Sequence, residues 1–290
     1  MMNITASMVK DLREKTGAGM MDCKRALQET EGDFDKAIDH LREKGIAKAA
    51  SKVGRVTSEG AVVTAISADG KSCAIIEMSC ETDFVARTDD FKTFCKTIAE
   101  QVVNSKSPAS IDDFKSQRFS DDTSLTIAEA VQGLVGKLGE NMSLRRVEKI
   151  ENVSGVTSYI HPGDKLGVIV AFDGVNDCGS VVFKDVARDV AMHVAATGPQ
   201  AINRDEIDST LIDKEREIFR QQALNDGKPE KIIDKIINGK IDKFYSEITL
   251  TEQAFVKDPD TTVGELLKSK AGEIGDGLAV SRFVRYRLGE

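Results

Sequence analysis

The chain has 290 residues, of which 40% are hydrophobic and 30% are charged, and its formal net charge is −8. This length favours about two domains, and the composition is typical of a globular protein with a packed core. The acidic balance repels phosphate backbones, which argues against nucleic acid as a partner. No apolar run approaches the ~20 residues of a membrane span, and the N-terminal sequence lacks the apolar stretch of a signal peptide. We therefore expect a cytoplasmic protein.

The cysteines and histidines do not form a metal-binding pattern. The five cysteines stand far apart and include no C-x-x-C pair, so neither a zinc ribbon nor a thioredoxin-type motif is supported. The three histidines, His40, His161 and His193, are scattered along the chain. We expect reduced thiols, no metal and no cofactor.

Residues 1–55 have the spacing of three short helices that would pack as a small bundle. The third helix has the clearest pattern, because apolar residues recur at helical spacing from Phe34 to Leu41. A helix boundary is expected where a capping residue or a glycine interrupts such a pattern. The expected helix starts are Thr5 or Ser7, Asp22 and Asp33, and the expected breaks are Gly17, Gly19 and Gly45.

An internal repeat runs through residues 56–290. Short motifs recur in the same order and at nearly constant spacing in the two halves of this region. Each copy has the pattern of strand, turn, strand, loop and helix, with β-branched residues around a glycine-containing turn. The repeat predicts two related α+β subdomains, at residues 56–150 and 151–290. The matching segments are 63–66 with 156–159, 74–76 with 167–169, 91–92 with 183–184, and 98–102 with 190–194.

A polar stretch at about residues 202–247 interrupts the second subdomain. Two charged helices, at about 205–225 and 229–238, flank a break with the sequence Asp-Gly-Lys-Pro. This pattern predicts a helical hairpin. Its apolar stripe fits an arm that packs against another chain. It fits equally a solvent-exposed hairpin whose two helices pack only against each other.

The last strand is expected at residues 282–288. Its alternation puts Phe283 and Arg285 on one face and Val284 and Tyr286 on the other. The sequence ends soon afterwards, at Glu290.

Three stretches carry a resemblance to a known family, at residues 12–27, 80–87 and 191–196. The first reads Leu-Arg-Glu-Lys-Thr-Gly-Ala-Gly-Met-Met-Asp-Cys-Lys-Arg-Ala-Leu, the second contains Thr-Asp-Phe-Val, and the third reads Ala-Met-His-Val-Ala-Ala. In this order and at this spacing, they make nearly the whole chain similar to the elongation factor Ts family.

The resemblance implies a fold for each part of the chain. The N-terminal helices resemble the ubiquitin-associated-like three-helix bundle of that family, and the repeat resembles its two core subdomains. The polar hairpin resembles its coiled-coil dimerisation arm, which allows a homodimer. Some family members carry a further C-terminal helical module, and we expect it to be absent here because the sequence ends at Glu290.

The resemblance also implies a function without covalent chemistry. Members of the family are guanine-nucleotide exchange factors for elongation factor Tu. In them, the Asp and Phe of the Thr-Asp-Phe-Val motif push into the nucleotide domain of the partner and disturb its Mg²⁺ site. The matching residues here are Thr82, Asp83, Phe84 and Val85. From the residues alone, Phe84 fits either a core position below the following helix or an exposed wedge, and the resemblance favours the wedge.

Five further residues are candidates for partner contact through the resemblance, and each also has a structural interpretation. Met20 and Met21 fit a soft contact at the turn before the second helix, or the core of the bundle, which we expect at least one of them to fill. His161 fits a solvated turn, and His193 fits a hydrogen-bonded core position. Arg13 lies on the helix before the methionine turn.

Two other classes of function compete with the exchange factor. A hydrolase or transferase would use Cys80, Glu81 and Asp83 with a distant histidine, but no nucleophile elbow is present. A ubiquitin-like binding scaffold would rest on the N-terminal bundle alone and leave the Thr-Asp-Phe-Val motif unexplained. The sequence Gly-Ala-Gly at residues 17–19 is not a phosphate loop, because no strand precedes it and the GxxxxGK[ST] pattern is missing.

Overall fold

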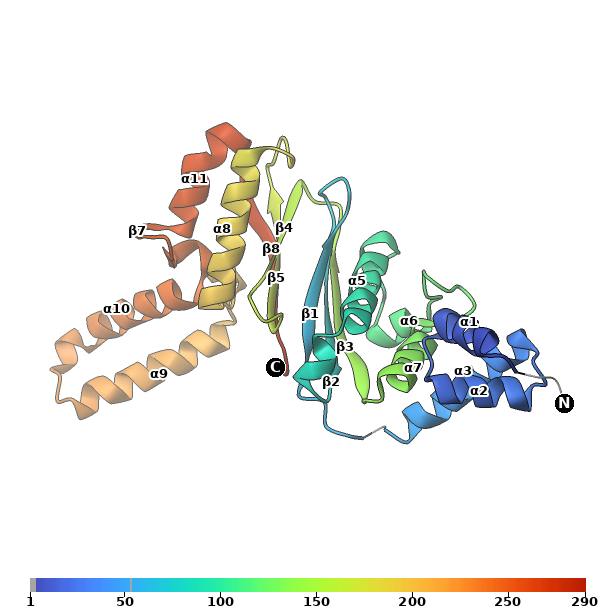
Figure 1. The fold of residues 1–290 in the computed structure, drawn as a ribbon. Coiled ribbons are helices and arrows are strands. Elements are labelled where there is room, and N and C mark those ends of the chain that lie inside the picture. The colour runs from blue at the N-terminus through green and yellow to red at the C-terminus, as the bar shows by residue number, and fades with distance from the viewer. Residues whose placement is uncertain (1–3, 53) are drawn as a thin grey trace.

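The computed structural model describes residues 4–52 and 54–290. These residues form a mixed α+β fold in which N-terminal helices, two three-stranded antiparallel sheets and a helical hairpin follow one another across the molecule (Figure 1). Among them, no helix combines the length and the apolar character that a membrane span requires.

The N-terminal helices are α1 (Ala6–Thr16), α2 (Met20–Glu29) and α3 (Phe34–Ala50). Their apolar faces share a small core around Leu12 and Leu27, which are fully buried. Thr5 caps α1 through its side chain, and Gly17 ends it in a left-handed conformation, as the sequence predicts.

Two predicted helix boundaries are wrong. The N-cap of α2 is Gly19, and Asp22 lies inside the first turn, because the helix already begins at Met20. Gly45 does not end α3, which continues to Ala50. The glycine serves packing instead: a Cβ added at Gly136, on the facing helix, would lie 3.0 Å from the Cα of Gly45. The two glycines therefore allow a close approach of two helices.

The first half of the repeat forms a sheet in the order β1-β2-β3, with helices over its outer face. The β1–β2 hairpin is at the predicted place, whereas β3 and the helices between α5 and β3 are absent from the sequence prediction. The strands are β1 (Glu59–Ile66), β2 (Cys73–Cys80) and β3 (Met142–Ile150), and the helices are α4 (Asp83–Ala86), α5 (Asp89–Asn104), α6 (Ile111–Ser116) and α7 (Ile127–Leu138).

The second half has the same plan, with a sheet in the order β4-β5-β8 and α8 and α11 over its outer face (Figure 1). A small hairpin, β6–β7, precedes α11. The strands are β4 (Gly155–Ile160), β5 (Leu166–Asp173), β6 (Ala254–Phe255), β7 (Asp258–Thr262) and β8 (Ala279–Arg287), and the helices are α8 (Val181–Thr197) and α11 (Val263–Ile274).

The two sheets pack face to face, so that the molecule has helix, sheet, sheet and helix layers at its centre (Figure 1). Their shared core contains Ile75 and Val62 from the first sheet and Ile169 and Tyr286 from the second. Gly167 of β5 lies close to the first sheet, since an added Cβ would be 2.5 Å from the side chain of Val62.

The alternation expected in the last strand is confirmed. Phe283 packs in the core below α8, and Arg285 on the same face donates to the carbonyl of Ala195 in α8. Val284 and Tyr286 point the other way, into the core between the sheets.

The polar stretch is a helical hairpin formed by α9 (Ser209–Asn225) and α10 (Glu230–Ile248), which projects from the second half (Figure 1). The expected bounds of both helices need correction. Asp208 caps α9 by accepting the backbone N–H of Thr210 at 2.8 Å, which sets a later start. The second helix runs on past Asn238 because its buried stripe continues through Ile241.

Candidate partner-binding surface

Phe84 lies on the surface at the end of β2. The strand ends at Cys80, and three residues later the chain begins α4, a single helical turn from Asp83 to Ala86. The side chain of Phe84 is 81% exposed. The interpretation of Phe84 as a core residue is therefore wrong, and the motif presents an aromatic ring to solvent.

The backbone around Phe84 is held by its neighbours. Thr82 caps α4 by accepting the N–H of Val85 at 3.4 Å. The N–H and hydroxyl of Thr82 both donate to the carboxylate of Glu140, at 3.0 and 2.6 Å. On the inner side of α4, Val85 packs against the core of the first half. The exposed ring therefore stands on a fixed support.

Sequence reasoning missed Glu140. This residue lies 58 positions after Thr82, in the connection between α7 and β3. It reaches the motif because β3 pairs with β2 so that Met142 lies opposite Cys80. No local signal in the sequence marks this contact, since β3 itself was not predicted.

Asp83 is paired within its own segment. Its carboxylate lies 2.8 Å from the guanidinium of Arg87, one helical turn later, and both side chains remain partly exposed. An exposed pair of this kind contributes little to stability and can exchange its partner at low cost. Asp83 is thus available for a new contact beside Phe84.

Glu81 serves the support of the motif. Its carboxylate accepts the backbone N–H of Asn141 at 2.6 Å and lies 3.5 Å from the guanidinium of Arg55. The hydrogen bond from Asn141 and the nearby arginine lower the pKa of Glu81, so the group is ionised at neutral pH.

Cys80 is unsuited to nucleophilic chemistry. The residue is fully buried, and its S–H donates to the carbonyl of Thr82 at 3.1 Å. Burial and the neighbouring Glu140 carboxylate raise the pKa of this thiol to about 12. A nucleophilic cysteine needs a lowered pKa, so the geometry does not support the hydrolase or transferase reading.

The two methionines at the start of α2 are both exposed, Met20 by 54% and Met21 by 66%. The expectation that at least one of them fills the bundle core is wrong, because Cys23, Ala26 and Leu27 fill it instead. Arg13, on the preceding helix α1, is exposed as well.

Lys137 connects the methionine turn with the Phe84 motif. A Cβ added at Gly17 would lie 2.6 Å from the Cε of Lys137, so the turn before Met20 rests on this lysine. The ammonium of Lys137 lies 2.7 Å from the carboxylate of Asp90, in the first turn of α5 and shortly after α4. Lys137 thus links the turn before Met20 with the start of α5, the helix that follows the Phe84 motif in the chain.

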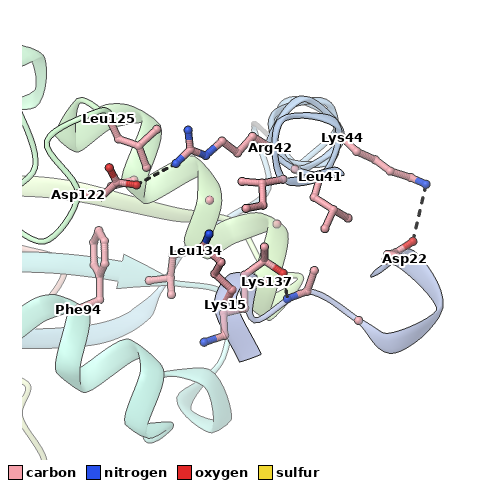
Figure 2. Close-up of a pocket in the computed structure, with 18 of the residues that line it drawn as sticks. Lys15, Asp22, Leu41, Arg42, Lys44, Phe94, Asp122, Leu125, Leu134 and Lys137 are labelled. Atoms are coloured by element: carbon pink, nitrogen blue, oxygen red, sulfur yellow. Dashed lines mark hydrogen bonds and ion pairs between the residues drawn. The ribbon is translucent and has the colours of Figure 1, made fainter. Parts of the chain in front are cut away.

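A cleft of about 330 Å³ lies beside this support, between the N-terminal bundle and α7 (Figure 2). Leu41 and Leu134 face it from the two sides, and Phe94 contributes to its apolar floor. At its rim, Arg42 of α3 lies 2.9 Å from the carboxylate of Asp122. The contacts of the bundle with the core thus include this ion pair and the glycine contact of α3 with α7.

The two candidate histidines differ in accessibility. His161 is exposed at the β4–β5 turn, where its Nδ1 lies 3.1 Å from the Tyr159 hydroxyl. His193 is fully buried in α8, with Nε2 2.9 Å from the side chain of Gln253 and Nδ1 accepting the N–H of Val256 at 3.3 Å. Burial lowers the pKa of His193. The expected partner contact at His193 is not available in this structure, since the ring has no exposed surface.

Comparison with known proteins gives a consistent relationship. A family model described as "Elongation factor TS" matches residues 81–290. The chain is 50% identical to the elongation factor Ts of Clostridium kluyveri over 288 residues, which cover 99% of this chain and 93% of that protein. It is 49% identical to the elongation factor Ts of Clostridium tetani over 99% of this chain and 94% of that protein. On these matches, the chain belongs to the elongation factor Ts family.

Proposed function

We propose that this protein releases GDP from elongation factor Tu by inserting Phe84 into the nucleotide domain of that GTPase. As a member of the elongation factor Ts family, the protein is a nucleotide exchange factor for elongation factor Tu in translation elongation. It is not an enzyme, and as a bacterial translation factor it acts in the cytoplasm.

The observation that carries the proposal is the exposed aromatic ring on a fixed support. Phe84 is 81% exposed, while Thr82 below it is bound to Glu140 by two hydrogen bonds. Burial of such a side chain in a partner pocket supplies about 1.5–3 kcal/mol. Little of this is lost to ordering, because the support is already rigid before the encounter.

The insertion acts on the nucleotide through the Mg²⁺ site of the partner. Asp83 leaves Arg87 and, with Phe84, displaces the segment that holds the cation. The phosphates of GDP then lose a neutralising charge, and GDP dissociates faster. Because the protein binds the nucleotide-free partner best, nucleotide and exchange factor weaken the binding of each other by the same factor.

The turn at Met20 and Met21 forms a second contact with the same partner. Both methionine side chains are exposed, and Arg13 is exposed nearby. Methionine suits such a contact because its flexible thioether adapts to an irregular apolar surface. His161, exposed at the β4–β5 turn, is proposed as a further contact from the second half.

The parts of the chain divide this work. We propose a ubiquitin-associated-like bundle with its linker at residues 1–55, and core subdomains at 56–150 and 151–290. The hairpin at about 202–247 is proposed as an arm through which two copies associate. Ile218, Leu224 and Ile232 of the arm are more than 40% exposed. This exposure favours contact with a second copy over a hairpin whose apolar residues pack only between its own two helices.

The mechanism is tested by the Mg²⁺ dependence of a Phe84→Ala variant. In Mg²⁺, release of fluorescent GDP from elongation factor Tu should be at least about 30-fold slower with the variant than with the wild type, equivalent to an aromatic hot spot of about 2 kcal/mol. In excess EDTA the difference should shrink, since the cation that Phe84 displaces is already gone. An undiminished difference in EDTA would show that Phe84 acts on another element of the partner.

A further inference from the structure

Val56 is an exposed apolar residue with no role in the fold. Among the large apolar side chains that the structure describes, Val56 and Phe84 are the most exposed, at 82% and 81%. Single exposed apolar residues are common on protein surfaces. Whether Val56 has a binding function therefore depends on its place in the fold and on how its neighbours hold the chain.

Val56 and Phe84 stand at the same end of the first sheet. Val56 lies three residues before β1, which begins at Glu59, and Phe84 lies four residues after β2, which ends at Cys80. Glu59 and Cys80 are paired across the two strands. The two exposed side chains thus flank one end of one hairpin.

The backbone on both sides of Val56 is fixed. The carbonyl of Arg55 accepts a hydrogen bond from the side-chain amide of Asn141 at 2.9 Å. On the other side, the hydroxyl of Thr57 accepts one from the hydroxyl of Ser79 in β2, at 3.0 Å. Val56 is therefore presented to solvent by a bound segment, and its burial in a partner would cost little ordering.

The supports of Val56 and of the Phe84 motif are one network. Asn141 donates through its side chain to Arg55 and through its backbone N–H to Glu81, which directly precedes Thr82. The residue before it, Glu140, holds Thr82. The connection between α7 and β3 therefore holds the chain next to both exposed residues.

We propose that Val56 is a further apolar contact with the GTPase, at the same end of the first sheet as Phe84. The inference rests on the proposed function, because it makes Val56 part of the same interface. The side chain of Val56 would enter an apolar pocket on the surface of elongation factor Tu, next to the site that receives Phe84. Val56 adds affinity to the complex and does not act on the Mg²⁺ site.

The test compares Val56→Ser with Val181→Ser. Val181 is a matched control, because it is 73% exposed and begins α8 in the other half of the molecule. The measured quantities are the dissociation constant for nucleotide-free elongation factor Tu and the maximal rate of GDP release. Val56→Ser should weaken binding about ten- to a hundredfold, as expected for one fully buried valine. Val181→Ser should bind like the wild type, and both should keep the wild-type melting temperature.

A photo-reactive amino acid at position 56 gives an independent readout. It should crosslink to elongation factor Tu in the complex, and the same residue at position 181 should not. Equal affinities for the two serine variants, with no crosslink from position 56, would overturn the contact. If Phe84→Ala still abolished exchange in that case, the proposed function would stand without Val56. If Phe84→Ala were also without effect, both proposals would be wrong.

Discussion

The ring of Phe84 is kept in solvent by contacts that its neighbours make. Thr82 provides the cap of α4 and two hydrogen bonds to Glu140, while Val85 anchors the inner side of the turn. The exposed ring of Phe84 can therefore be buried in an apolar pocket on a partner. We therefore expect the affinity of this surface to depend on the residues that hold α4 as well as on Phe84.

A Thr82→Val variant should separate support from contact. It keeps Phe84 but loses the cap and the hydroxyl bond to Glu140, which costs about 1 kcal/mol. We expect GDP release from elongation factor Tu to slow about threefold to tenfold at subsaturating protein, as measured by fluorescent GDP. The control is Thr126→Val, which removes a similar cap from α7. An equal loss of exchange in both variants would contradict a local effect.

The cysteines should differ in reactivity because Cys80 is buried and Cys178 is partly exposed. The folded-state pKa of Cys80 is raised from 9.0 to about 12. Its neutral thiol therefore stabilises the fold fully below pH 9, and this contribution is lost as the pH rises towards 12. At pH 8, iodoacetamide should label Cys178 and spare Cys80, as peptide mass spectrometry can measure. Rapid labelling of Cys80 would contradict the burial of this residue and would make its thiol a candidate nucleophile again.

The motif could be predicted from the sequence, but the use of each side chain could not. Phe84 follows a buried strand, where an aromatic residue can equally cover the core or face solvent. Met20 and Met21 likewise fit either the bundle core or the surface, and both are exposed. His193 was placed correctly on a helix with apolar neighbours, yet only the structure gives Gln253 and the N–H of Val256 as its partners.

The helices and strands show where local pattern prevails and where tertiary contact overrides it. The two β-hairpins and the helices α5 and α8 follow from the repeat, because each pattern is carried by neighbouring residues. The local pattern predicts a break at Gly45, but α3 continues through this residue, and the glycine lies where α7 approaches closely. β3 was missed because its pairing with β2 is distant in sequence.

The arm is expected to mediate self-association through its exposed apolar residues. Ile218 of α9 and Ile232 of α10 are 47% and 43% exposed, outside the seam that holds the two helices together. Replacing both with Asp should abolish any concentration-dependent dimer in sedimentation equilibrium, because charge in a desolvated apolar contact is costly. The monomeric variant should release GDP from elongation factor Tu at the wild-type rate. A wild-type protein that stays monomeric at all concentrations would contradict the arm as a dimer contact.

Across the whole molecule, the two sheets depend on close contact at Gly167. A methyl group there would lie 2.5 Å from Val62 and 2.8 Å from Ile160, so the sheets must separate or their side chains must shift. Gly167→Ala should lower the free energy of unfolding by about 1–3 kcal/mol, measured by urea denaturation. Gly272→Ala is the control, since an added methyl group there meets nothing within 4 Å. Equal stability of Gly167→Ala and the wild type would contradict the packing of the sheets.

In the whole molecule, the methionine turn and the Phe84 motif are two exposed apolar sites on one chain. Lys137 supports the turn before Met20 and pairs with Asp90, close to the Phe84 motif. Under the proposed function, the methionine turn and Phe84 contact the same partner, and Phe84 alone acts on its Mg²⁺ site. The rate of GDP release should therefore respond to Phe84 more strongly than to any single residue of the turn.

The most direct test loads elongation factor Tu with fluorescent GDP and adds this protein in substoichiometric amounts. The wild type should release GDP from many partner molecules per molecule of factor. Phe84→Ala should lose this activity and keep the wild-type melting temperature, because the side chain is 81% exposed. Wild-type rates of GDP release by a folded Phe84→Ala protein would contradict insertion of Phe84 as the cause of exchange.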